Sequence, residues 1–211
     1  VPGKFKCVKA IGWYVSEYNR AQISINFTNY KISPIHQVFD SVCDLASKRG
    51  LRVTGSELVG LIPKSALIDA GKYYLKKQGR SLGVSESDIL ECAVQSLGLN
   101  DVSKFNSKEK IIEFAIEDKK DSLLHLSTDD LIHSISQNSP APGGGSVSAL
   151  AGALGAALLS MVSLLTYDKK EYFSKRKKMS RLGEMAHKYQ KRLKELVDED
   201  THAFDSVMDA S

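Results

Sequence analysis

The sequence predicts an α+β domain, a β-sheet with helices on one face, followed by an all-α helical domain. Residues 4–30 are rich in β-branched and aromatic side chains, which is typical of paired strands. Helical periodicity begins after Ser33-Pro34 and recurs in three segments of the first half. A charged stretch, EDKKDS, runs from Glu117 to Ser122, and every strong pattern beyond it is helical.

That charged stretch predicts the domain boundary. We expect a first domain over residues 1–117, a linker over 118–122 and a second, helical domain over 123–211. The chain starts without Met or a signal peptide, and its last helical run has no Gly or Pro stop signal. We therefore expect a piece of a longer protein whose second domain is incomplete.

Composition narrows the class of protein. With 211 residues, 42% hydrophobic and 26% charged, the chain can bury a core, and a net charge of +4 is too small for a protein that wraps nucleic acid. Cys7, Cys43 and Cys92 are widely spaced and form no CxxC pair, so we expect reduced thiols in the cytoplasm. The five histidines show no ligand spacing, so no metal site is expected.

The first domain alternates strands and helices. In QISINFT the polar residues Gln22, Ser24 and Asn26 share one face of a strand, and apolar residues take the other. This polar face is either the solvent side of a half-buried sheet or the lining of a ligand groove. Helices are expected from Pro34 to Gly50, from Pro63 through Tyr74 and from Ser85 to Gly98, with LRVTGSELVGLIP as strand and loop between the first two.

A glycine loop opens the second domain's long helix, after a short helix that Thr128 is expected to cap. The loop, SPAPGGGS, lacks the preceding strand and the GK[ST] signature of a P-loop. Gly143, Gly144 and Gly145 allow backbone N–H groups to approach a ligand at the helix N-terminus, where a carboxylate or polar ring is favoured. The alternative is a tight turn capped by Ser146.

The helix after the loop has no charge from Ser146 to Tyr167, which is long enough to cross a bilayer. Small residues at Gly152, Ala156 and Ser160 form one ridge, on which another helix can approach closely. A buried helix in a bundle or dimer explains the run as well as a membrane span does.

An acid interrupts an apolar stripe near the end of the chain. Leu193, Leu196, Val197, Phe204, Val207 and Met208 recur at helical spacing, and Asp200 falls among them, whereas Asp198, Glu199 and Asp205 point elsewhere as solvated carboxylates. A carboxylate aimed into a packed interface needs a partner or a raised pKa, which suits a general acid or base. A structural ion pair is the other interpretation. The basic segment 169–194 is either a solvated face or a surface for an acidic ligand or RNA.

These landmarks together resemble the formiminotransferase-cyclodeaminase family, the bifunctional folate enzymes of histidine breakdown. The matching stretches are KAIGWYVSEYNRAQISINFTNY, VTGSELVGLIP, LGL with F-x-x-KEKIIEFAI, SPAPGGGSVSALAGALGAAL, LLTY and VDEDTHAF. They occur in the family's order and span nearly the whole chain. The resemblance implies the C-terminal subdomain of the transferase, then the start of a helical, dimeric cyclodeaminase domain without a membrane span.

The resemblance also implies an activity and a site. Asp200 matches the acid of the family's D-x-x-A-F motif, its proposed catalytic residue in closing 5-formiminotetrahydrofolate to 5,10-methenyltetrahydrofolate with loss of ammonia. Tetrahydrofolate polyglutamate and formiminoglutamate are the implied ligands, and a homo-oligomer the implied assembly. Folate-binding candidates are the loop residues Pro142, Gly143, Gly144, Gly145 and Ser146, together with Gln22 and Asn26. A non-catalytic interaction module and a membrane-attached protein are the competing classes.

Overall fold

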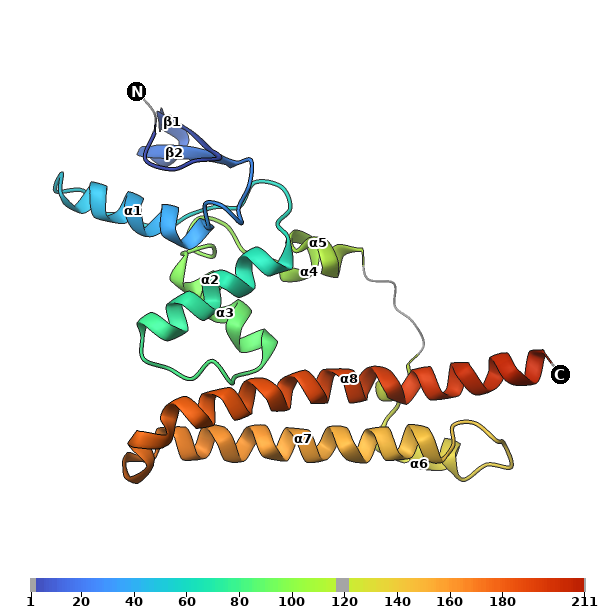
Figure 1. The fold of residues 1–211 in the computed structure, drawn as a ribbon. Helices are drawn as coiled ribbons and strands as arrows, with labels where there is room; N and C mark the ends of the chain where they lie inside the picture. The colour runs from blue at the N-terminus through green and yellow to red at the C-terminus, as the bar shows by residue number, and fades with distance from the viewer. Residues whose placement is uncertain (1–2, 117–121, 211) are drawn as a thin grey trace. The chain divides into compact units, whose positions relative to one another are not determined.

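The structure is a computed structural model that describes residues 3–116 and 122–210, apart from the side chains of Tyr18, Asp205 and Asp209. The expected linker residues 118–121 lie outside the described residues, as does the side chain of Asp205. The chain divides into two compact units. The first runs to Gln78 and resumes at Glu86, and the second comprises Gly79–Ser85 and the residues that follow the linker. Figure 1 shows the helices and strands of both units.

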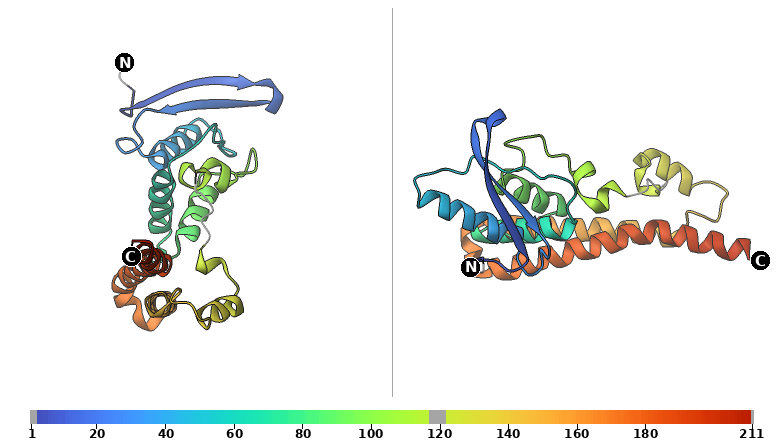
Figure 2. Two further views of the ribbon diagram at one scale, coloured as in Figure 1. Left: turned by 90° about the vertical axis from the view of Figure 1, so that its right-hand side faces the viewer. Right: turned by 90° about the horizontal axis from the view of Figure 1, so that it is seen from above.

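The first unit begins with the expected pair of strands. β1 (Val8–Val15) and β2 (Arg20–Phe27) form an antiparallel hairpin in which Val8 pairs with Phe27 and Val15 with Arg20. A short 3-10 turn, η1 (Ser16–Tyr18), and Asn19 at φ 50° reverse the chain. The helices of this unit lie on one side of the hairpin (Figure 2). This confirms the α+β class predicted for the first domain.

Three helices follow the hairpin in the chain, as expected: α1 (Ile35–Ser47), α2 (Lys64–Lys77) and α3 (Glu86–Ser96). α2 and α3 approach so closely that a Cβ on Gly71 would lie 2.0 Å from the carbonyl oxygen of Ile89. Glycine at this position therefore sets the separation of the two helices. The fully or nearly fully buried core residues of this unit include Ala66, Leu67, Ala70, Leu75, Ile89, Leu90, Ala93 and Ile111.

The prediction of a strand within LRVTGSELVGLIP is wrong. Residues 51–61 form no strand, and only Ile62 makes an isolated parallel bridge, with Ile111. The segment is held instead to the end of α3: the Ser56 N–H donates to the Gly98 carbonyl (2.9 Å). β-branched residues favour a strand only where a partner strand is available, and the described residues offer none here. Two single-turn helices follow, α4 (Ser107–Lys110) and α5 (Ile112–Ala115).

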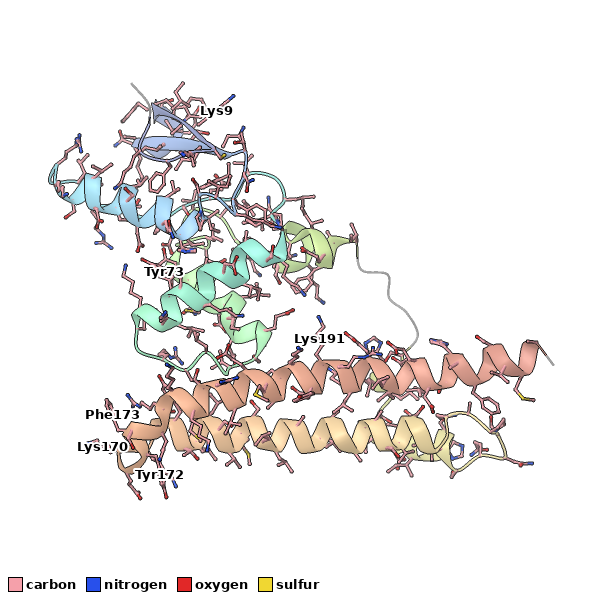
Figure 3. The ribbon with its side chains drawn as sticks, viewed as in Figure 1. Lys9, Tyr73, Lys170, Tyr172, Phe173 and Lys191 are labelled. Atoms are coloured by element: carbon pink, nitrogen blue, oxygen red, sulfur yellow. The ribbon has the colours of Figure 1, made fainter. Side chains whose placement is uncertain are left out.

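A polar cluster joins α1 to α2. The Asp40 carboxylate accepts hydrogen bonds from the hydroxyls of Tyr73 (2.8 Å) and Tyr74 (3.0 Å) and from Lys77 Nζ (2.6 Å). Burial acts to raise the pKa of Asp40, but the hydrogen bonds from Lys77, Tyr73 and Tyr74 outweigh it, so this pKa lies below its ordinary value. Tyr73, labelled in Figure 3, stacks on the buried His36 ring at a centroid distance of 4.3 Å.

The second unit is helical, as predicted. Its elements are η2 (Leu123–His125), α6 (Thr128–Ile135), α7 (Gly144–Asp168), η3 (Lys170–Lys175) and α8 (Arg176–Asp209). The cap of α6 is one residue earlier than expected, because the Ser127 hydroxyl accepts from the Asp130 N–H (3.1 Å) and Thr128 is the first helical residue. η3 reverses the chain between the two long helices, and its residues Lys170, Tyr172 and Phe173 are labelled in Figure 3.

α7 and α8 lie side by side along most of their length (Figure 2). Small side chains make the close approach possible: Ala149, Ala153, Ser160 and Ser163 of α7 are buried, as are Ala186 and Val197 of α8. The predicted small-residue ridge faces α8, since a Cβ on Gly152 would lie 3.3 Å from Leu193. By length and composition α7 is also able to cross a membrane, with a mean hydropathy of 2.0 in its most apolar window.

The histidine in the α1–α2 cluster predicts a pH-dependent stability. Burial lowers the pKa of His36 below its ordinary 6.5, against the opposing charges of Asp69 and Asp40. The unfolded chain therefore takes up a proton at a higher pH than the folded chain does. We expect the free energy of unfolding to fall as the pH drops below 6.5, until the folded-state histidine is also protonated.

Urea unfolding followed by circular dichroism between pH 8 and pH 5 measures this effect. His36→Phe keeps a ring against Tyr73 but does not titrate, so its unfolding free energy should depend less on pH in this range. His133→Gln is the control, because His133 is exposed on α6. Equal pH slopes for the wild type and His36→Phe would contradict the assignment.

Candidate active site

The first turn of α7 meets Asp200 on α8. Gly143 has an extended backbone (φ −115°, ψ −159°) and precedes the first helical residue, Gly144. The Ser146 backbone N–H donates to Asp200 Oδ2 at 2.8 Å. The N–H groups of a helix's first turn have no partners within the helix, so a carboxylate from a neighbouring helix satisfies one of them. Asp200 therefore acts as a cap for α7, although it lies 54 residues away in sequence.

Asp200 also lies flat against the backbone of Gly145. A Cβ on Gly145 would be 2.1 Å from Asp200 Oδ1 and 2.4 Å from its carboxyl carbon, far inside van der Waals contact. A Cβ on Gly144, one residue earlier, would meet nothing within 4 Å. The two adjacent glycines therefore differ: Gly145 makes room for the acid, and Gly144 faces open space.

The hydroxyl of Ser146 points into α8. Its Oγ lies 2.8 Å from the Val197 carbonyl oxygen, 3.2 Å from Asp200 Oδ2 and 3.2 Å from Thr201 Oγ1. Ser146 is only 3% exposed. We predicted this residue as part of the ligand-binding loop, but the structure turns its side chain inward, toward the carboxylate and away from solvent.

Asp200 itself is exposed, in contrast to the interface position that the apolar stripe predicted. The reason is that α7 begins opposite Asp200, so α8 continues for more than two turns beyond the N-terminus of α7. Val207 and Met208, which continue the stripe, are accordingly 63% and 56% exposed. Asp200 is thus not buried and makes no ion pair with any residue that the structure describes; it is held instead by a hydrogen bond to a helix terminus.

Asp198 was expected to be a solvated carboxylate, and this is wrong. It accepts the Ser122 hydroxyl (2.6 Å) and the Leu123 N–H (2.9 Å), and so holds η2 against α8. No local sequence signal predicts this contact, because its partners are more than 70 residues apart. Glu199 behaves nearer to expectation as an exposed partner of Arg192, at 2.8 Å from its Nη2.

An open cavity of about 330 Å³ lies beside this turn of α8. The sequence pattern does not predict this cavity, because its wall combines η2 with residues of α8 that are distant from η2 in sequence. Thr201 belongs both to this wall and to the hydrogen-bonded group around Ser146. The lining residues are Ser122, Leu123, His125, Leu126, Asp198, Thr201 and His202.

The remaining predicted loop residues lie at the start of α7. Pro142 follows a cis peptide bond to Ala141, and Gly143 and Gly144 continue the loop into the helix. Gly144 is exposed, so a ligand has access to the loop there. Among the described residues, no group of three or more His, Cys, Asp and Glu side chains lies close enough to hold a metal ion.

Gln22 and Asn26 belong to the first unit, whereas Asp200 belongs to the second. Both lie on β2. Gln22 Oε1 accepts a hydrogen bond from Trp13 Nε1 (2.9 Å), its cross-strand partner, and Asn26 pairs with Lys9 and is exposed. Their roles as ligand residues stay predictions.

Comparison with known proteins gives two matches to family models. The model described as "Formiminotransferase domain" matches residues 1–117, and the one described as "Formiminotransferase-cyclodeaminase" matches residues 127–211. The formimidoyltransferase-cyclodeaminase of Sus scrofa is 38% identical over 211 residues, which are 99% of this chain and 39% of the relative. That of Gallus gallus is 39% identical, again over 99% of this chain and 39% of the relative.

A shorter relative resembles only part of the chain. The methenyltetrahydrofolate cyclohydrolase of Methylorubrum extorquens is 38% identical over 76 residues, 36% of each protein. The chain spans about 39% of the length of the curated bifunctional relatives.

The contrast between the two glycines predicts opposite effects of one substitution. Gly145→Ala places a methyl group where the Asp200 carboxyl lies, so the carboxylate must leave the α7 terminus and a hydrogen bond is lost. We expect a loss of about 1–2 kcal/mol in stability. Gly144→Ala replaces a helical glycine in open space and should be neutral or stabilising by about 0.5–1 kcal/mol.

Urea unfolding of the two variants and the wild type measures the difference. NMR of the Ser146 amide shows whether the hydrogen bond to Asp200 is kept, which we expect in Gly144→Ala only. Equal stability and equal Ser146 amide shifts in both variants would show that Asp200 does not lie against Gly145.

Proposed function

The chain belongs to the formiminotransferase-cyclodeaminase family, and on this premise we propose that it is part of a bifunctional folate-dependent enzyme of histidine degradation. The proposed reactions are transfer of the formimino group from formiminoglutamate to tetrahydrofolate, and cyclodeamination of 5-formiminotetrahydrofolate to 5,10-methenyltetrahydrofolate. The relatives' names support both activities. The second unit contributes to the cyclodeaminase, which is a lyase because ammonia is eliminated.

One observation carries the cyclodeaminase assignment: Asp200 is exposed, and only one of its two oxygens is held. Oδ2 accepts from the Ser146 N–H, whereas no hydrogen bond to Oδ1 is found among the described residues. An acid or base in catalysis needs a fixed position and a free oxygen within reach of substrate. Asp200 meets both requirements.

In the proposed reaction, N10 of the folate attacks the formimino carbon on N5, and a new C–N bond closes the five-membered ring. The formimino group reacts in its protonated form, –CH=NH2⁺, so the attack leaves an NH2 group on the carbon. Asp200 takes the proton from N10 and delivers it to this amine nitrogen, which then carries three hydrogens. The bond between the carbon and this nitrogen then breaks, and ammonia leaves. The loop of Pro142, Gly143 and Gly144, which is exposed at Gly144, would bind the pterin or a glutamate carboxylate through the backbone N–H groups of its glycines.

The basic residues of η3 and α8 suit the polyglutamate tail of folate. Lys and Arg residues recur from Lys169 to Lys194, and nearly all are exposed. Glutamate carboxylates would be attracted to this surface by charge alone. Tetrahydrofolate is therefore the proposed substrate and carrier, and no metal is part of the proposal. In the transferase, Gln22 and Asn26 remain proposed folate contacts.

The exposed face of α7 supports self-association. Val147, Leu154, Leu158, Met161 and Leu165 are 39% to 60% exposed, and their spacing of seven, four, three and four residues is that of a coiled-coil seam. A helix with one face on α8 and an opposite apolar face needs a second partner. We propose that this partner is a second copy of the protein.

The three free cysteines agree with a cytoplasmic location.

The same face keeps one alternative open, a non-catalytic fragment that only oligomerises or binds folate. This alternative predicts that Asp200 affects stability and assembly but not turnover. A bilayer around α7 is a further possibility by length and composition.

Substitution of Asp200 tests the proposed function. In the full-length protein, Asp200→Asn should lower the kcat of cyclodeamination by about 10²–10⁴-fold, because the amide cannot accept the N10 proton. Calorimetric binding of tetrahydrofolate polyglutamate should change much less. Gly144→Val should instead weaken binding, since its side chain projects from the open side of the loop. Unchanged turnover in Asp200→Asn is the result that would refute this role.

Polar substitutions on α7 test the assembly. Leu154→Gln with Leu158→Gln should lower the oligomeric state measured by sedimentation, because the buried apolar seam is interrupted. The control is Ser148→Gln, which alters an exposed polar position of the same helix. If the unsubstituted protein instead requires detergent and sediments with lipid vesicles, the bilayer interpretation replaces self-association.

A further inference from the structure

The Ser146–Asp200 contact contains more donors than the capping of a helix requires. Oδ2 of Asp200 faces both the N–H of Ser146 (2.8 Å) and its hydroxyl (3.2 Å). The hydroxyl also lies 2.8 Å from the Val197 carbonyl oxygen and 3.2 Å from the Thr201 hydroxyl, both on α8. One buried serine thus connects the acid to two successive turns of its own helix.

The two carboxyl oxygens of Asp200 have different hydrogen-bonding roles. A backbone N–H only donates, and it bonds an oxygen without a proton more strongly, so the Ser146 N–H on Oδ2 favours Oδ1 as the oxygen that carries a proton of Asp200. The Ser146 hydroxyl has one proton for two acceptors, Asp200 Oδ2 and the Val197 carbonyl. It can donate to Oδ2 when the acid is ionised and to Val197 when the acid is protonated.

We propose that Ser146 is a positioning residue for Asp200: its N–H and hydroxyl hold Oδ2, so that Oδ1 is the oxygen that exchanges the proton with substrate. This inference rests on the proposed cyclodeaminase function. It differs from the role that the sequence predicted for Ser146, because a side chain that is 3% exposed acts through the acid and not on the folate.

Thr201 completes the arrangement. Because the Ser146 proton is directed to Val197 or to Asp200, the 3.2 Å contact with Thr201 Oγ1 is made by the threonine's own proton. Thr201 therefore keeps the Ser146 oxygen in place while its proton changes acceptor. It lies one residue after Asp200 and also lines the neighbouring cavity, which gives it contact with both regions.

Steady-state kinetics of the full-length protein test the positioning role. Ser146→Ala should lower the kcat of cyclodeamination about tenfold and leave KM within about twofold, since the N–H remains and only the hydroxyl is lost. Ser163→Ala is the matched control: Ser163 is also buried in α7 (2% exposed), but its hydroxyl donates only to Leu159 of the same helix. This control should keep the wild-type kcat.

An isosteric pair at Thr201 provides a rescue. Thr201→Val removes the hydroxyl at nearly constant volume and should lower kcat, whereas Thr201→Ser keeps the hydroxyl and should restore most of it. Thermal melts of all variants separate folding from turnover. A lowered melting temperature with wild-type kcat in Ser146→Ala would assign Ser146 a structural role only and overturn the proposal.

An NMR titration of this chain tests the geometry without any substrate. The Ser146 amide proton should shift as acid is added, because the carboxyl group whose Oδ2 it bonds takes up a proton on Oδ1, and this response should vanish in Asp200→Asn. A Ser146 amide that ignores the titration overturns the positioning role. If the amide responds but the unsubstituted full-length protein shows no cyclodeaminase turnover, the proposed function fails and the positioning inference falls with it.

Discussion

The contact between the first turn of α7 and Asp200 is the constraint on which the second unit depends. It determines where α7 begins along α8, and the small residues of both helices then pack in the register that follows. Oδ1 and the carboxyl carbon lie so close to Gly145 that no other residue type fits without moving the acid. A structural requirement, the satisfaction of a helix N-terminus, and a chemical one, a fixed carboxylate with one free oxygen, are met by the same few atoms.

Asp200 does not lie in a buried environment. The residue is exposed, and its orientation comes from hydrogen bonds with a neighbouring helix. The residues beside it that hold its position are buried: Ser146 is 3% exposed and Val197 is 1% exposed. Such an arrangement leaves the acid accessible to a large ligand such as folate while its position is defined by the core. Asp198, two residues earlier, anchors η2 in the same way and is thereby separated in role from Asp200.

Two apolar surfaces are left without partners among the described residues. On the first unit, Ile11, Trp13, Tyr14 and Ile23 of the hairpin are each more than half exposed, and a two-stranded hairpin is marginal by itself. On the second, the outer face of α7 has the spacing of a helix–helix seam. Exposed apolar surfaces of this extent are typical of places where further protein packs. It also explains why α7 meets the length and hydropathy criteria of a membrane helix although its small residues pack on α8.

By itself the sequence determined the fold class, the three helices of the first unit, the hairpin and the long α7, because periodicity, helix caps and motif order are local signals. Only the tertiary structure decided that residues 51–61 form no strand, that Ser146 faces inward and that Asp200 is exposed at a helix terminus. Each of these depends on contacts between residues distant in sequence. Periodicity shows which face of a helix is apolar, but not where the neighbouring helix begins, and the position of that first turn converts an expected buried acid into an exposed and anchored one.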